Sequence, residues 1–155
     1  MLAIAGGKGG CGKTTTTYRL GRALAADARS PLLVDADVEL PDLHRVAGVP
    51  RAPGLAAVAG GRPPASVPHT LADHSALAVL PASDADADAL AAAAPRLRAW
   101  DGPVLLDCPA GAMADAVGPL RVADRTLLVS TPRRRSLRDA VKTAAMAREL
   151  DAAPL

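Results

Sequence analysis

Aromatic and amide side chains are nearly missing from this chain of 155 residues, which has no Phe, one Trp, one Tyr and neither Asn nor Gln. A core without many aromatic rings must be filled by Leu, Val and Ala, and this favours close helix–sheet layers over an aromatic-rich β-sandwich. The length suits a single domain over residues 1–155, able to bury roughly two-thirds of its unfolded surface.

Strong charge, long apolar runs and abundant cysteines are missing as well. The net charge of +2 is too small to predict a nucleic-acid partner by itself. No apolar run reaches transmembrane length, and the N-terminus enters a predicted strand without a signal peptide. We therefore expect a cytoplasmic protein whose two cysteines, Cys11 and Cys108, are free thiols. Both are expected to be buried and inert, with a thiol switch as the alternative.

The glycine-rich stretch Gly6–Thr15 is the most informative part of the chain, because it contains the pattern G-x-x-x-x-G-K-[ST]. An apolar run at 2–5 precedes it and a helical pattern over 14–26 follows, which is the strand–loop–helix context that the pattern requires. Glycines allow backbone N–H groups to approach an anion, and the helix directs its positive end to the same place. The pattern predicts phosphate binding, with Lys13 along the β- and γ-phosphates and the Thr14 hydroxyl on Mg²⁺.

Lys8 makes the phosphate-binding pattern typical of one particular protein family. The run Lys-Gly-Gly-Cys-Gly-Lys-Thr-Thr that begins there resembles the deviant Walker A motif of the MinD/ParA ATPases. The resemblance implies a homodimer in which Lys8 of each subunit contacts the ATP held by the other; a solvated loop lysine is the alternative. The residues that would then bind nucleotide are Gly7, Lys8, Gly9, Gly10, Cys11, Gly12, Lys13, Thr14 and Thr15.

Acidic residues follow two of the apolar runs. Leu32–Val34 leads into Asp35 and Asp37, and Val104–Leu106 leads into Asp107. Buried parallel strands deliver the residues at their ends to the carboxyl edge of a sheet, where ligands bind in open α/β folds. These acids are therefore candidate site residues, and acids that only cap a strand or a helix are the alternative.

Both acidic segments resemble MinD/ParA motifs, the second through Asp107-Cys108-Pro109-Ala110-Gly111. The resemblance implies that Asp35 and Asp107 support Mg²⁺ through water, together with Thr14. It also implies that Asp37 positions the attacking water and that Gly111 registers the γ-phosphate. Lys8, Lys13 and Asp37 would then form the catalytic set.

Strands alternate with helical segments along the chain. This predicts an α/β fold, a mostly parallel sheet of about five strands flanked by helices, and the resemblance implies a SIMIBI-type P-loop NTPase. The remaining strands are expected at 76–83 and 125–132, with one short helix at 55–59 inside a Pro- and Gly-rich loop. Asp84, Asp86 and Asp88 are expected in the first turn of a helix that reaches Arg98, rather than in a Ca²⁺ loop.

The last helix is expected to be capped by Ser136, with Asp139 completing a capping box, and to reach about Leu150. Its apolar face is predicted from the helical spacing of Leu137, Val141, Ala144 and Ala145. Just before this helix lies Arg133-Arg134-Arg135, interpreted as a solvated turn. The alternative is a contact of these arginines with nucleotide, DNA or an anionic surface.

The resemblance extends from Leu2 to about Leu150 and then stops. The family usually continues with further strands, a base-reading Asn and a C-terminal helix that binds membrane in MinD. We therefore expect a C-terminally short domain without the membrane helix, with no Asn to select adenine. Asp151–Leu155 is expected to fray, and the last strand to remain an uncovered edge.

These motifs together predict a Mg²⁺-ATP-binding molecular switch that hydrolyses ATP slowly under the control of a partner. By resemblance to the family, it would position division machinery, a chromosome or another cargo. One alternative is a non-catalytic nucleotide-binding interaction module that has lost turnover through truncation. A metal-cluster carrier or nitrogenase-like reductase is disfavoured, because the chain has no C-x-x-C and only Cys108 could serve as a ligand.

Overall fold

A six-stranded sheet in the order β3-β4-β2-β5-β1-β6 forms the centre of the described fold. The computed structural model describes residues 1–110 and 114–155, and for 114–116 only the backbone. The strands are β1 (Leu2–Ala5), β2 (Leu32–Asp35), β3 (His69–Leu71), β4 (His74–Leu80), β5 (Val104–Asp107) and β6 (Arg125–Leu128). All neighbours pair in parallel except β3 and β4. The predicted α/β class and mostly parallel sheet are confirmed.

The additional strand is β3, which forms an antiparallel hairpin with β4. This pairing draws the start of β4 back to His74, two residues before the predicted start of this strand at Ala76. β6 is shorter than the predicted strand at 125–132, because its partner β1 ends at Ala5, which lies opposite Leu128.

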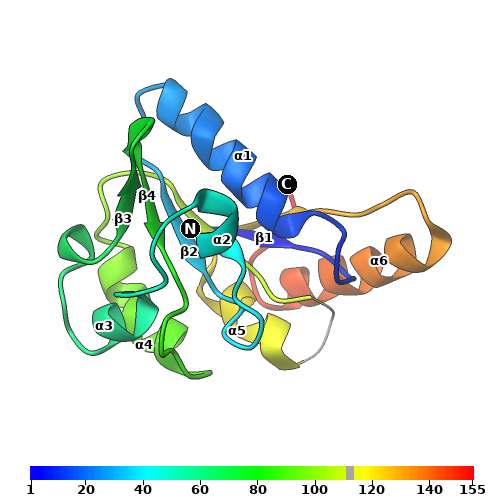
Figure 1. The fold of residues 1–155 in the computed structure, drawn as a ribbon. Coiled ribbons are helices and arrows are strands. Elements are labelled where there is room, and N and C mark those ends of the chain that lie inside the picture. The colour runs from blue at the N-terminus through cyan, green and yellow to red at the C-terminus, as the bar shows by residue number, and fades with distance from the viewer. Residues whose placement is uncertain (111–113) are drawn as a thin grey trace.

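Helices cover both faces of the sheet (Figure 1). They are α1 (Lys13–Ala26), α2 (Leu43–Ala47), α3 (Leu55–Ala59), the 3₁₀ turn η1 (Pro64–Ser66), α4 (Ala89–Leu97), α5 (Ala114–Val122) and α6 (Arg134–Glu149). α3 is the predicted short helix. None of the helices in the described part of the chain is long and apolar enough to cross a membrane.

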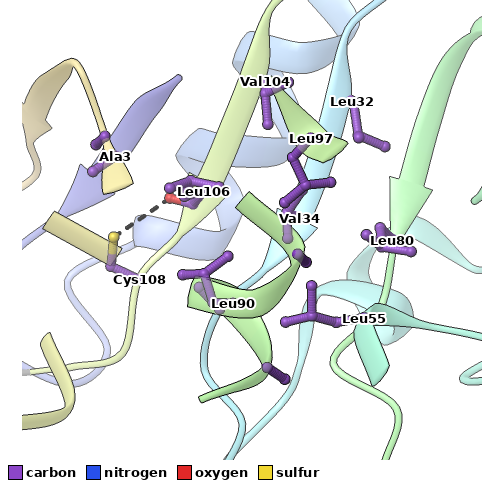
Figure 2. Packing of buried hydrophobic residues seen from close by; sticks show 14 of the residues in the cluster. Ala3, Leu32, Val34, Leu55, Leu80, Leu90, Leu97, Val104, Leu106 and Cys108 are labelled. Carbon is purple, nitrogen blue, oxygen red and sulfur yellow. Dashed lines mark hydrogen bonds between the residues drawn. The ribbon is translucent and has the colours of Figure 1, made fainter. Parts of the chain in front are cut away.

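The core consists of two layers, one on each face of the sheet. In β2, Leu32 and Val34 pack with the layer that includes Leu55 of α3 and Leu90 of α4 (Figure 2). Leu33 points to the other layer, which α1 and α2 cover. Both faces of the strand are fully buried, as expected for a parallel sheet between helices.

The acids at 84, 86 and 88 do not lie in the first turn of α4, so that prediction is wrong. The helix begins at Ala89, after Asp88. The Asp86 carboxylate accepts a hydrogen bond from the Asp88 N–H at 3.1 Å, which forms an Asx turn ahead of the helix. Asp84 adopts a left-handed backbone with φ of 53°. These residues therefore belong to the connection between β4 and α4.

The predicted capping box of α6 is also wrong. The helix begins at Arg134, with Arg133 in the N-cap position, so Ser136 lies inside the first turn. Its hydroxyl accepts a hydrogen bond from the Thr131 N–H at 3.2 Å and lies 3.0 Å from the Ser130 hydroxyl. The serine therefore ties the preceding loop to the helix instead of capping it.

α6 buries a different face from the predicted one. Leu137 and Val141 are 49% and 68% exposed. The buried positions are Ser136, Ala140, Thr143, Ala144 and Ala147, so only Ala144 of the predicted face is buried. The reason is close packing, since a Cβ on Gly7 would overlap Asp139 of α6. Small side chains face inward at this contact, and the larger apolar ones are left outside.

The C-terminal tail is ordered against β6, so the predictions of a frayed tail and an uncovered edge are wrong. The buried Thr126 hydroxyl donates to the Ala152 carbonyl at 2.7 Å. The Leu155 N–H donates to the Thr126 carbonyl at 2.9 Å, and Pro154 forms a parallel bridge with Thr126. Ala152 is fully buried.

Candidate functional site

The loop between β1 and α1 lies at the carboxyl edge of the sheet, where the chain leaves Ala5. Gly12 directly precedes α1 with φ of 98°, a left-handed backbone that side chains with a Cβ rarely adopt. Lys8, Gly9 and Gly10 are exposed, whereas Gly7 is packed against α6. One side of the loop therefore packs against α6, and the other side is open to solvent.

The start of α1 is suited to bind an anion. Lys13, its first residue, is only 7% exposed. Among the described residues, no side chain caps this end of the helix and no acid stands in its first turn. The free N–H groups and the positive end of the helix dipole therefore face the glycine loop without a protein partner.

Two buried carboxylates lie next to this helix. β2 and β5 pair in parallel with Asp35 directly opposite Asp107, and their exposed fractions are 0% and 3%. Asp35 accepts hydrogen bonds from the N–H groups of Asp37 at 3.2 Å and Leu43 at 3.1 Å. Register alone therefore brings together two acids that are 72 residues apart in sequence.

Burial changes the protonation of both groups. It raises the pKa of Asp35 to about 7, with a further contribution from the neighbouring charge of Asp107. Burial also raises the pKa of Asp107 to about 6, although hydrogen bonds from the Thr14 and Thr17 hydroxyls and the charge of Lys13 act in the opposite direction. Nearby positive charge would favour the ionised form of both.

These residues fit a magnesium–nucleotide complex. Hard oxygen ligands of the kind that Mg²⁺ prefers are supplied by Asp35, Asp107 and the hydroxyl of Thr14, while Lys13 and the helix end suit phosphate. Within the described ranges there is no group of three or more His, Cys, Asp or Glu that could hold a metal. An all-protein cage is not required, because Mg²⁺ commonly uses one or two carboxylates together with phosphate oxygens and waters.

Asp37 lies on the loop that follows β2. Its carboxylate accepts the N–H of Leu40 at 3.0 Å, and its own N–H is bound by Asp35. The loop also borders a cavity of about 280 Å³, whose lining includes Ala36, Asp37, Val38, Leu90 and Pro109. Asp37 is half-buried at the edge of the site and is tied to one of its two buried acids.

The remaining predicted residues lie at different depths. Thr15 is exposed, and Gly111 lies outside the described residues. Cys11 is only partly buried, with its thiol 3.4 Å from the Val129 carbonyl, so the expectation of burial fails for this cysteine. Cys108 is buried, and its thiol donates to the Leu106 carbonyl (Figure 2). Burial raises the pKa of the Cys108 thiol above its usual range, as expected for an inert cysteine.

Thr17 is a site residue that the motif comparison missed. Its fully buried hydroxyl lies 3.1 Å from Oδ1 of Asp107 and 3.0 Å from the carbonyl of Lys13. Helical spacing was the available signal, since a residue four positions after Lys13 shares its face of the helix.

The comparisons with known proteins agree with this geometry. The sequence model of the CobQ/CobB/MinD/ParA nucleotide binding domain matches residues 2–152. The chain belongs to this family. The predicted membership of the MinD/ParA P-loop ATPases is therefore confirmed.

MinD proteins are among the relatives within this family. The septum site-determining protein MinD of Synechocystis sp. is 30% identical over 149 residues, which cover 90% of this chain. The cell division ATPase MinD of Pyrococcus furiosus superposes with a TM-score of 0.86 at 29% identity, covering 99% of this chain and 68% of that protein. MinD of Pyrococcus horikoshii, solved in complex with Mg-ADP, gives 0.87 at 28% identity, covering 99% of this chain and 67% of that protein.

The chain is shorter than these relatives. It spans 56% of the length of the Synechocystis protein. The matched part includes the glycine loop, both buried acids and all of α6.

Proposed function

We propose that the protein is a Mg²⁺-ATP-dependent molecular switch of the MinD/ParA kind, with slow hydrolysis under the control of a partner. The observation that carries the proposal is the buried pair Asp35 and Asp107 beside the buried Lys13 at the uncapped start of α1. The family membership and the Mg-ADP complex of the Pyrococcus horikoshii relative support it.

Each side chain then has a role set by its position. Lys13 and the loop amides stabilise negative charge on the phosphates. Thr14, Asp35 and Asp107 would hold the metal directly or through water, and Asp37 would orient the attacking water. When bound, Mg²⁺ neutralises charge that develops on the phosphate oxygens. Gly111 keeps its predicted role as the residue that registers the γ-phosphate.

Lys8 has a different role in the proposal. It is exposed on the open side of the loop, which leaves its ammonium free to contact the ATP of a second copy. ATP would then join two subunits, and its hydrolysis would release them. Such a switch could position division machinery, a chromosome or another cargo in the cytoplasm.

The test is to titrate the chain with Mg²⁺-ATP and Mg²⁺-ADP while following thermal stability and mass in solution. A ligand at about one hundred times its Kd should add about 2.7 kcal/mol of stability, and only ATP should produce a dimer. Lys13→Ala should lose the stabilisation by both nucleotides. The proposal fails if neither nucleotide stabilises the parent chain, or if the Lys13→Ala variant binds as tightly as the parent.

A non-catalytic nucleotide-binding module is the second candidate. This candidate predicts the same stabilisation by nucleotide but no release of phosphate. Measuring ATP hydrolysis on the same preparation, with Asp37→Ala as the inactive reference, separates the two functions.

α6 offers a surface for an anionic partner. Arg133, Arg134 and Arg135 are exposed at its start. The exposed Leu137 and Val141 form an open hollow of about 550 Å³ with Arg134, Arg138 and Lys142. We propose an acidic protein segment as the partner rather than DNA, because apolar side chains between the cations suit a protein surface better than phosphates. Duplex DNA that binds with a steep salt dependence, lost in Arg134→Glu, would instead favour the DNA interpretation.

A further inference from the structure

The Thr17 hydroxyl of α1 contacts the buried acid Asp107 of β5. No sequence motif assigned a role to Thr17. The hydroxyl lies 3.0 Å from the Lys13 carbonyl and 3.1 Å from Oδ1 of Asp107. A threonine hydroxyl carries a single hydrogen, so it can donate fully to only one of these acceptors.

The Lys13 carbonyl and the Asp107 carboxylate differ in how much a hydrogen bond from Thr17 would stabilise them. Within α1 the Lys13 carbonyl already accepts the helical N–H bond from four residues ahead. The Asp107 carboxylate is 3% exposed and has lost almost all contact with water. A hydrogen bond to an ionised carboxylate is roughly twice as strong as one between neutral groups. The hydrogen of Thr17 therefore belongs to Asp107 whenever that acid is ionised.

We propose that Thr17 is a positioning residue, which fixes the orientation of the Asp107 carboxylate relative to α1 and so tunes the affinity of the site for Mg²⁺. The inference rests on the proposed function, because Asp107 is there a metal-supporting group. Groups that hydrogen-bond to metal-supporting carboxylates typically change metal affinity or activity by about 10- to 100-fold when they are removed.

Thr143 of α6 provides a matched control. Its side chain is also fully buried, and its hydroxyl donates to the carbonyl four residues earlier, Asp139, at 3.0 Å. In this respect it repeats the contact of Thr17 with Lys13. It lacks the second contact to a carboxylate among the described hydrogen bonds. A Thr→Val change at 143 therefore removes the same kind of helical bond without affecting the site acids.

The experiment measures the affinity of the full chain for ADP by calorimetry, with Mg²⁺ and with EDTA, for Thr17→Val, Thr17→Ser and Thr143→Val. We expect Thr17→Val to reduce the Mg²⁺-dependent gain in ADP affinity by about tenfold or more, with the affinity in EDTA unchanged. Thr17→Ser should keep the gain because it retains the hydroxyl, and Thr143→Val should behave like the parent. If Thr17→Val does not fold, Thr17→Ala takes its place.

Two results would overturn the inference while the proposed function survives. One is a parent-like Mg²⁺-dependent gain in Thr17→Val. The other is an equal loss of affinity with and without Mg²⁺, which would mean that Thr17 supports only the start of α1. If the parent chain itself shows no Mg²⁺-dependent binding of ADP, the proposed function fails, and the role of Thr17 fails with it.

Discussion

The buried acids should make the ligand-free protein less stable at alkaline pH. The pKa of Asp107 is about 6 in the folded chain and 3.8 for a free Asp side chain. Because the folded value is the higher one, stability is fully present below about pH 4 and is lost as the pH rises through about 6. Each pKa unit corresponds to about 1.4 kcal/mol, so this group alone should cost the fold about 3 kcal/mol at pH 8. Asp35, with a pKa of about 7, acts in the same direction.

Asp107→Asn removes the ionisable group and keeps its shape. The hydroxyls of Thr14 and Thr17 can rotate to donate to the amide oxygen or accept from its nitrogen. We therefore expect this variant to be more stable than the parent at about pH 8 by about 1–3 kcal/mol, and to show a weaker pH dependence. At about pH 4 the two proteins should be close in stability, because the acid of the parent is then protonated in the folded chain and still partly protonated in the unfolded chain.

The assay is urea unfolding followed by circular dichroism in EDTA, at several pH values between about 4 and 8. Asp101→Asn, at an exposed acid, is the control and should follow the parent. Equal stability of the parent across this pH range, or a lower stability of Asp107→Asn than of the parent at about pH 8, would contradict the raised pKa of the buried acids. Bound Mg²⁺-ADP should reduce the pH dependence of the parent, because positive charge favours the ionised acids.

Three further substitutions test the packing of the glycine loop, the C-terminal tail and α6. Gly7→Ala should lower the free energy of unfolding by about 1–3 kcal/mol, because its methyl group would overlap Asp139 of α6. The control is Gly118→Ala, where an added Cβ meets open space, and it should not destabilise the protein in the same urea assay. Thr126→Val should lose about 1–2 kcal/mol, because it removes the hydrogen bond that holds the Ala152 carbonyl; parent-like melting would contradict the ordered tail. Val141→Asp should change stability by less than about 0.5 kcal/mol, because this side chain is 68% exposed. A large loss of stability in Val141→Asp would mean that α6 is rotated about its axis so that Val141 faces the core.

Local patterns in the sequence determined the parts of the site that are contiguous in the chain. A strand, a glycine loop and a helix follow one another over 2–26, so spacing and glycine content were enough to place Lys13 and Thr14. The acids at 35 and 107 could also be predicted, because parallel strands end at the same edge of a sheet. Their placement at one point required only that β2 and β5 be neighbours.

Tertiary packing decided what these patterns could not. Thr17 meets Asp107 across 90 residues of sequence. Helical spacing places Thr17 on the same face of α1 as Lys13, but only the packing of α1 beside β5 brings that face to Asp107. α6 turns small residues inward because the glycine loop lies against it, so the helical spacing of Leu137 and Val141 predicted the wrong face. Periodicity reports which side chains could share a face, and only the neighbouring backbone decides which face is buried.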